Sequence, residues 1–178
     1  MTDDVYRLDV VFYRTETRTA DGTIVRADIP ARATVNSSGY DVGAYCPDGP
    51  IEIPPMQVRR INTGLVLALP QRATMLVCSR SGLASKGVQV INAPGIIDSD
   101  YRDEVGVLLT YIAPPTAPPF VVTHGMRIAQ MLYLPAPSMS EVTRAYPHFQ
   151  EVDARDRLPS IGNSTRRGGF GSTGVERL

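Results

Sequence analysis

The sequence predicts an all-β protein of one domain, with its strands arranged as a barrel or as two packed sheets. The chain has 178 residues, which suits a single domain with a core of its own. Its 15 glycines and 15 prolines are spread along the chain and separate short apolar runs. Segments longer than about ten residues lack the 3.6-residue apolar period of an amphipathic helix. This pattern favours an all-β barrel or double sheet.

The apolar runs mark the expected strands, several of which alternate imperfectly, as half-buried strands do. Asp21-Gly22 predicts a hairpin turn between the first two runs. Ser81–Lys86 could form a turn or two of helix, and the prolines of residues 113–120 predict a stiff surface loop. The expected strands are Val5–Tyr13, Thr23–Ile29, Gly64–Leu69, Thr74–Cys78, Val88–Ile91, Val105–Ile112, Phe120–Val122 and Ile128–Leu134.

Charge and composition argue against several functional classes. Basic and acidic residues number 18 each, so the formal net charge is zero and nucleic-acid binding through bulk charge is not expected. The sequence lacks eighteen consecutive apolar residues and begins MTDDVYRLDVVF, so we expect neither membrane association nor a signal peptide. Cys46 and Cys78 form no CxxC pair, which indicates a reducing compartment. We therefore expect a cytoplasmic protein, in a host cell if the source is a virus.

Four acidic residues cluster between two expected strands, at Asp98, Asp100, Asp103 and Glu104. A carboxylate at such a junction can be held by the sheet and act as a general base on water. The alternative is a hairpin tip with solvated charges, which is typical of acidic clusters. Asp98 follows two isoleucines, and Tyr101 stands where its ring could pack against a ligand or serve as an ordinary turn aromatic. The residues alone leave both interpretations open.

The segment Cys78–Ala84 is a candidate anion site. Free backbone N–H groups at the start of a short helix attract anions, and Arg80 adds a planar donor fork suited to phosphate. A simple helix cap by Ser79 or Ser81 explains the same residues.

Two further segments carry polar residues beside expected strands. Asp41 follows a turn and precedes an apolar residue. Arg127 and Gln130 lie three residues apart on one strand, so we expect at most one of them to face a given site.

Residues 158–178 are rich in Gly, Ser, Thr and Arg and predict a mobile tail. Phe170 between glycines makes this tail suited to closing over a flat anionic ligand, although a disordered solubilising terminus is the alternative.

Taken in order, five of these segments resemble the signature motifs of the trimeric dUTPases, the deoxyuridine triphosphate nucleotidohydrolases. Each motif alone is weakly specific, whereas five in the right order are specific. The resemblance covers roughly residues 30 to 178, and the N-terminal hairpin and the Pro-rich loop look longer than the family's usual form. The motifs are Ser38-Gly39-Tyr40-Asp41-Val42, Arg80-Ser81-Gly82-Leu83-Ala84, Asn92 through Arg102, Gly125-Met126-Arg127-Ile128-Ala129-Gln130 and Gly169-Phe170-Gly171-Ser172-Thr173-Gly174.

The resemblance implies a jelly-roll-like or distorted β-barrel subunit of a homotrimer, with active sites shared at subunit boundaries. Residues 1–160 would form the β core, and residues 161–178 a flexible arm that closes over an active site. The implied reaction is the hydrolysis of dUTP to dUMP and pyrophosphate by Mg²⁺-assisted, in-line attack of water on the α-phosphorus. It would lower dUTP and supply dUMP for dTMP synthesis.

The resemblance also implies a role for each motif residue. Asp98 matches the catalytic base, and Asp41 matches an acid that holds Mg²⁺ through water, with phosphate oxygens as the direct ligands. Asn92 would read the uracil edge, and Tyr101 would stack beneath the deoxyribose. The implied substrate-binding set is Arg80, Ser81, Gly82, Asn92, Gly95, Tyr101, Gln130, Arg166, Arg167, Phe170, Gly171, Ser172 and Thr173.

The chain departs from the family pattern in the fifth motif, where the usual arginine position holds Thr165. Either Arg166 or Arg167 would then reach the γ-phosphate.

Two other functions remain open: a dCTP deaminase (or a bifunctional deaminase and dUTPase) of the same fold, with Glu104 as the nearby acid, and a non-catalytic regulatory protein on this scaffold. The sequence also leaves open a regulatory protein partner.

Overall fold

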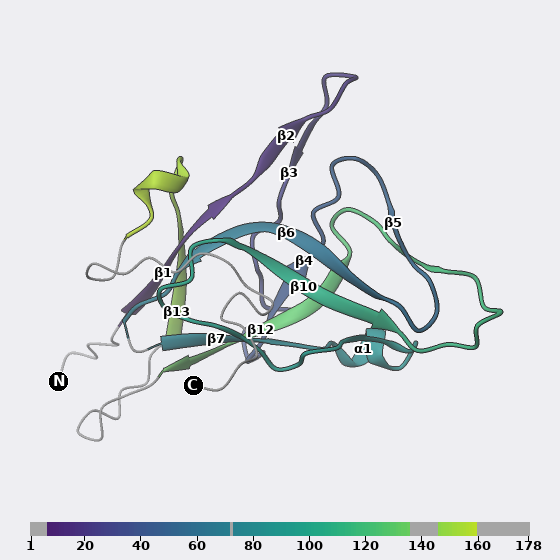
Figure 1. Ribbon diagram of the computed structural model, residues 1–178. Coiled ribbons are helices and arrows are strands. Elements are labelled where there is room, and N and C mark those ends of the chain that lie inside the picture. Colours follow the sequence, from purple (N-terminus) through teal and green to yellow (C-terminus); the bar gives the residue numbers. More distant parts are fainter. Residues whose placement is uncertain (1–6, 72, 136–145, 160–178) are drawn as a thin grey trace, which may run out of the picture.

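The computed structural model describes residues 7–71, 73–135 and 146–159 as an almost entirely β structure (Figure 1). Its two short helices are α1 (Ser81–Ala84) and the 3₁₀ turn η1 (Arg155–Arg157). Its strands are β1 (Arg7–Arg14), β2 (Glu16–Arg18), β3 (Ile24–Arg26), β4 (Tyr40–Gly43), β5 (Ile51–Ile53), β6 (Val58–Ala68), β7 (Ala73–Cys78), β8 (Val88–Val90), β9 (Gly95–Ile97), β10 (Glu104–Tyr111), β11 (Phe120–Val122), β12 (Arg127–Pro135) and β13 (Tyr146–Glu151).

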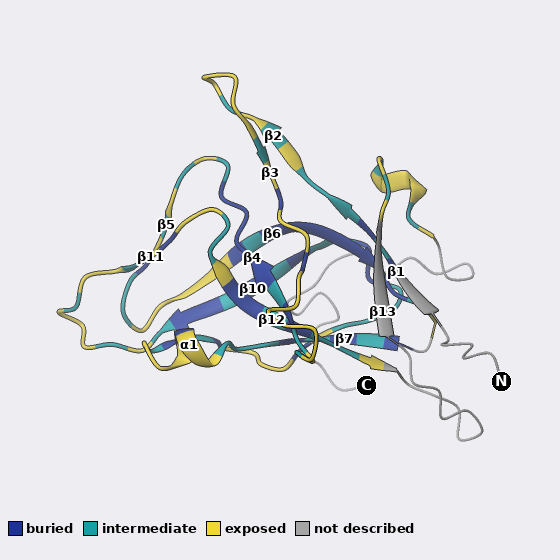
Figure 2. Cartoon of the chain, turned by 180° about the vertical axis from the view of Figure 1, so that it is seen from behind, coloured by how far each residue is buried: buried dark blue, intermediate teal, exposed yellow. Residues whose placement is uncertain are grey.

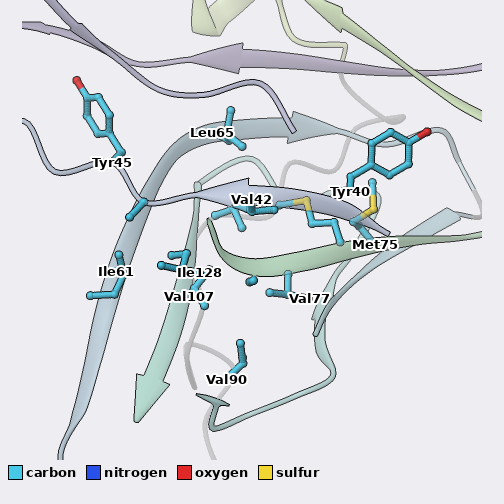
Figure 3. Close-up of a cluster of buried hydrophobic side chains, with 14 of the residues drawn as sticks. Tyr40, Val42, Tyr45, Ile61, Leu65, Met75, Val77, Val90, Val107 and Ile128 are labelled. Carbon is cyan, nitrogen blue, oxygen red and sulfur yellow. The ribbon is translucent and has the colours of Figure 1, made fainter. Parts of the chain in front are cut away.

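Two sheets enclose one apolar core. The larger sheet has the strand order β13-β1-β6-β10-β8, and the second has the order β4-β12-β7-β9. Both sheets contribute fully buried side chains to the cluster drawn in Figure 3, such as Leu65 from β6 and Met75 from β7. Burying a side chain of this size stabilises the fold by about 1.5–3 kcal/mol. The all-β, jelly-roll-like fold predicted from the sequence is therefore confirmed.

Strict alternation along β7 sets the phase of the second sheet around that strand. Along β7 every second residue is buried, so Val77 faces the core while Cys78 faces the opposite side. The neighbouring strands follow the same phase, because Met131 of β12 lies opposite Val77. A slip of one residue would exchange these two faces, and the position of the site depends on this register.

The predicted strands are present, but the sequence pattern missed several elements. β10, β11 and β12 lie within one residue of their expected ranges. β6 is longer than expected, because it begins at Val58 with exposed residues that interrupt the apolar pattern. The expectation missed β2, β4, β5, β9 and β13, four of which have only three or four residues. β13 pairs in parallel with β1, a contact distant in sequence that local pattern does not reveal.

The predicted hairpin at Asp21-Gly22 is confirmed and projects from the body of the molecule as β2 and β3 (Figures 1 and 2). The Asp21 carboxylate accepts hydrogen bonds from the Thr19 hydroxyl and the Thr23 N–H, and these bonds lower the pKa of Asp21.

In the described part of the chain, α1 and η1 are both too short to cross a membrane.

Candidate active site

A pocket of about 130 Å³ opens beside the core, where β7, β8, β9 and β10 meet. A cavity of about 150 Å³ accepts a benzene molecule, so this pocket has the size for a single flat ring. Val77, Val90 and Val107 form apolar walls and lie together at one end of the buried cluster (Figure 3). Among the described residues, the lining is formed by Val77, Val90, Asn92, Gly95, Ile96, Ile97, Asp98, Tyr101, Gly106 and Val107.

Four of the residues predicted to bind or act on substrate meet in this pocket: Asn92, Gly95, Asp98 and Tyr101. Gly95 lies opposite Val77 in the β7–β9 pair. A Cβ on Gly95 would lie 3.3 Å from the Asn92 Nδ2 atom and 3.6 Å from the Val77 Cβ atom. The glycine therefore leaves the space in which the Asn92 amide faces the pocket.

A tight turn carries Asp98 and Tyr101 to the pocket wall. The Tyr101 N–H donates to the Asp98 carbonyl at 3.1 Å, which closes the turn directly after β9. Tyr101 is 8% exposed, and its hydroxyl donates to the Glu104 carbonyl at 3.1 Å. Because both ends of this side chain are held, the ring is a rigid wall of the pocket. Asp98, at the end of β9, and Tyr101 thus both belong to the pocket lining.

A second polar cluster joins the first, second and fourth motifs around Asp41. Arg80 Nε donates to Asp41 Oδ1 at 2.7 Å, and Arg80 Nη2 donates to Oδ2 at 3.2 Å. Arg127 Nη1 donates to the same Oδ2 at 3.0 Å. Arg80 Nη1 also donates to the Arg127 carbonyl at 2.9 Å. One carboxylate thus fixes two guanidinium groups, and the cluster keeps a net positive charge suited to a polyanion.

Gln130 belongs to this cluster as well. Its Nε2 donates to the Ser79 carbonyl at 2.9 Å, and a Cβ on Gly39 would lie 2.6 Å from its Oε1. The expectation that at most one of Arg127 and Gln130 faces the site is wrong. A register shift between Arg127 and Ala129 breaks the simple alternation of β12, so both side chains reach the surroundings of Asp41.

The turn after β7 presents backbone donors. In α1 the N–H groups of Leu83 and Ala84 donate to the Arg80 carbonyl, so those of Ser81 and Gly82 precede the first helical bonds. The alternative of a serine cap is wrong, since α1 has no side-chain cap. The Ser79 hydroxyl instead accepts the Val90 N–H at 2.9 Å. Arg127 and Ser79 were not among the predicted site residues, and only the position of Arg127 within the fourth motif gave a signal.

The pocket and the Asp41 cluster lie on opposite faces of one sheet. Tyr40, Met131, Val77 and Gly95 form a cross-strand row on the core face, where the pocket opens. The next row along, Asp41, Gln130 and Cys78, faces the other way. The two sets of predicted residues therefore do not share a pocket within one chain.

The remaining predicted residues lie outside the described part of the chain. They are Arg166, Arg167, Phe170, Gly171, Ser172 and Thr173.

The described residues hold no group of three or more His, Cys, Asp or Glu side chains arranged to bind a metal ion. Mg²⁺ is commonly held through one or two carboxylates, waters and substrate phosphates. Asp41 fits this mode, because a carboxylate has about four acceptor positions and the two arginines occupy three. The free position, on Oδ1, can accept a hydrogen bond from a metal-bound water.

Comparison with known proteins gives a consistent result. The family model for dUTPase matches residues 25–174. A deoxyuridine 5'-triphosphate nucleotidohydrolase of Roseobacter denitrificans is 39% identical over 158 residues, covering 87% of this chain and 92% of that protein. The enzyme of the same name from Caulobacter vibrioides is 41% identical over 149 residues, covering 83% and 86%.

Solved structures agree in fold. A mutant dUTPase from phage phi11 of S. aureus, whose structure reveals the coordination of a structural Mg(II) ion, has a TM-score of 0.55 at 21% identity and covers 65% of this chain and 90% of that chain. The EIAV dUTPase has a TM-score of 0.53 at 22% identity, with coverage of 74% and 92%. The fold, the ring-sized pocket and these matches define an enzyme of the nucleotidohydrolase class. The chain belongs to the dUTPase family and is therefore classed as a dUTP diphosphatase.

Proposed function

We propose that this protein hydrolyses dUTP to dUMP and pyrophosphate, by Mg²⁺-assisted, in-line attack of a water on the α-phosphorus. The observation that carries the proposal is the pocket itself. This chain belongs to the dUTPase family, and it has a pocket of ring size. Asn92, Asp98 and Tyr101, which bring an amide, a carboxylate and an aromatic ring, all line that pocket.

The pocket accounts for base and sugar selection. Asn92 and the neighbouring backbone pair with the polar edge of uracil, while Val77 and Val90 contact its faces or its apolar edge. Pairing of buried polar groups penalises the wrong base strongly. We infer that the apolar walls lie too close to the base to accept a 5-methyl group. The Tyr101 ring lies beneath the deoxyribose and excludes a 2′-hydroxyl.

The Asp41 cluster accounts for triphosphate binding. Arg80, the N–H groups of Ser81 and Gly82, and Gln130 contact phosphate oxygens, and Asp41 fixes the direction of the Arg80 guanidinium. Mg²⁺ bound to the phosphate oxygens, and through water to Asp41, lowers the charge that an attacking nucleophile meets. Arg166 or Arg167 reaches the γ-phosphate, Phe170 and Gly171 cover the base, and Ser172 and Thr173 bind phosphate when the arm closes.

Asp98 is the general base. Asp98 lines the pocket with Tyr101. In this proposal its carboxylate orients the attacking water and accepts its proton. The water is held in line with the bond to the leaving pyrophosphate, and fixed geometry of this kind contributes much of the rate.

The protein acts as a homotrimer. The pocket and the Asp41 cluster face opposite sides of one sheet, so they complete one active site only when different subunits supply them. The outer face of this sheet carries an apolar cross-strand row, Leu132, Leu76 and Ile96. Ile96 is 64% exposed, and contact with another subunit would bury it.

The product supplies dUMP for dTMP synthesis while dUTP is kept low. Two free thiols, Cys46 and Cys78, suit a cytoplasmic location, in a host cell if the source is a virus.

The deaminase alternative depends on Glu104, and the structure directs that side chain elsewhere. Glu104 Oε1 accepts the Gly64 N–H at 2.7 Å, and Glu104 is not among the residues that line the pocket. The non-catalytic alternative is disfavoured by Asp98 and the Arg80–Asp41 pair, which keep the groups that the chemistry needs.

Pyrophosphate and ammonia release from dUTP, dCTP, dTTP and UTP, with and without Mg²⁺, test these functions together. We expect pyrophosphate from dUTP only, and only with Mg²⁺. Ammonia from dCTP would establish the deaminase, and no turnover of any nucleotide would leave the regulatory alternative. In ¹⁸O-labelled water the label should enter dUMP, because attack on the α-phosphorus places the new oxygen there. Label in pyrophosphate would contradict this step.

A further inference from the structure

A buried arginine lies directly behind the pocket loop. Arg102 is only 6% exposed. Its guanidinium donates hydrogen bonds to main-chain carbonyls. Nη1 donates to the Ser99 and Tyr101 carbonyls, both at 2.8 Å. Nε and Nη2 both donate to the Pro159 carbonyl, at 3.1 and 2.8 Å. One side chain thus joins the turn after β9 to a segment fifty-seven residues further along the chain.

A second arginine returns the contact from the other side. Arg155, in η1, donates from Nη2 to the Arg102 carbonyl at 2.6 Å and to Asp103 Oδ1 at 2.9 Å. The segment 154–159 is therefore attached to the pocket loop at three places: the Arg102 guanidinium, the Arg102 carbonyl and the Asp103 carboxylate. We call this segment the brace.

Burial of this guanidinium is costly, since burial lowers the pKa of Arg102 and only the charge of Asp100 works in the opposite direction. An apolar residue could fill such a site without that cost. The planar fork, however, can hold four carbonyl groups from three segments, those of Ser99 and Tyr101, Pro159 and, at 3.5 Å, Leu67 of β6, in one fixed arrangement, which an apolar side chain or a lysine cannot do. Arg102 therefore fixes the relative positions of these segments, although its burial is unfavourable.

We propose that Arg102 and Arg155 are positioning residues for the hydrolysis of dUTP: by tying the brace to the loop 98–104, they hold Asp98 and Tyr101 in the catalytic arrangement. The inference rests on the proposed function. Neither arginine touches substrate in this account, and each acts through the backbone of the loop. A displacement of the base by about 1 Å can lower a rate up to a hundredfold, so a loosened brace reduces kcat more than binding.

The test compares Arg155→Gln with Arg157→Gln, a matched control in the same 3₁₀ turn. Arg157 pairs with Asp153 at 2.9 Å and, among the described residues, forms no hydrogen bond or ion pair with the loop, while the charge change is identical. For each full-length variant, kcat, KM for dUTP, the ratio of dUTP to UTP turnover, and amide hydrogen exchange of residues 98–104 are measured. Arg102→Lys follows as a second variant, with thermal melting to show that it folds.

For Arg155→Gln we expect kcat to fall by about tenfold with a smaller change in KM, faster exchange in residues 98–104 and a lower dUTP preference. Arg155→Lys should recover part of the loss, and Arg157→Gln should match the wild type. If Arg155→Gln and a folded Arg102→Lys both keep wild-type kcat and exchange rates, the positioning role is wrong. A wild-type protein without dUTP turnover would instead refute the proposed function, and the exchange comparison would still decide whether the brace holds the loop.

Discussion

The Asp41 cluster yields a prediction that separates two roles for one carboxylate. In Asp41→Asn, Arg80 loses a bidentate, charge-assisted pair, and the new amide group turns donor hydrogens toward a guanidinium. The Asp41 and Arg80 side chains are 15% and 24% exposed, so this pair is well shielded, whereas Arg127 is 60% exposed and its share is small. Hydrogen bonds to charged groups contribute about 1.5–3 kcal/mol. A loss of about 2 kcal/mol corresponds to about a 30-fold fall in kcat/KM.

The assay is steady-state pyrophosphate release across a series of Mg²⁺ concentrations, with Asp48→Asn as a control for the charge change at an exposed position. If Asp41 mainly positions Arg80, excess Mg²⁺ leaves most of the defect in place. Full recovery at high Mg²⁺ would show that Asp41 acts only through the metal and would refute the positioning role. Wild-type activity at every concentration would remove Asp41 from the site.

Three further changes test the other parts of the account. Asp98→Asn should keep nucleotide binding but lower kcat by about 10²–10⁴-fold, the usual contribution of a general base, and near wild-type turnover would exclude Asp98 from that role. Tyr101→Ala should weaken discrimination between dUTP and UTP by about tenfold or more, checked by competing the two substrates, and an unaltered ratio would argue against the ring as the sugar platform. A chain that ends after Asn163 should keep its oligomeric state in light scattering and lose most of its turnover, whereas full activity would show that the arm takes no part in the reaction.

Much of the pocket was predictable because its residues are adjacent in sequence. Asn92, Gly95, Asp98 and Tyr101 lie within ten residues, and one short strand with its turn brings them together. Their residue types state their chemistry, and the family resemblance supplied their roles. The strands with clear apolar alternation, such as β7 and β10, were predictable for the same local reason.

Contacts distant in sequence were not predictable from local pattern. β13 pairs in parallel with β1, and Arg102 donates to the Pro159 carbonyl. Both contacts join segments far apart in sequence, and the periodicity of a single segment does not show which other segment it will meet. The β12 bulge that directs Arg127 and Gln130 to one cluster overrides the alternation rule, because one extra residue reverses the phase of the strand. The short strands β5 and β9 are too brief for a period to show.

The proposed reaction depends most directly on what the Asp98 carboxylate faces when substrate is bound. The decisive measurement is a crystal structure of the full-length protein with Mg²⁺ and a dUTP analogue whose α–β bridging oxygen is replaced by an imido group. We predict a water within about 3.2 Å of an Asp98 carboxylate oxygen, in line with the bond from the α-phosphorus to the imido nitrogen. A carboxylate directed away from the nucleotide, or an in-line water held by another residue, would contradict the account.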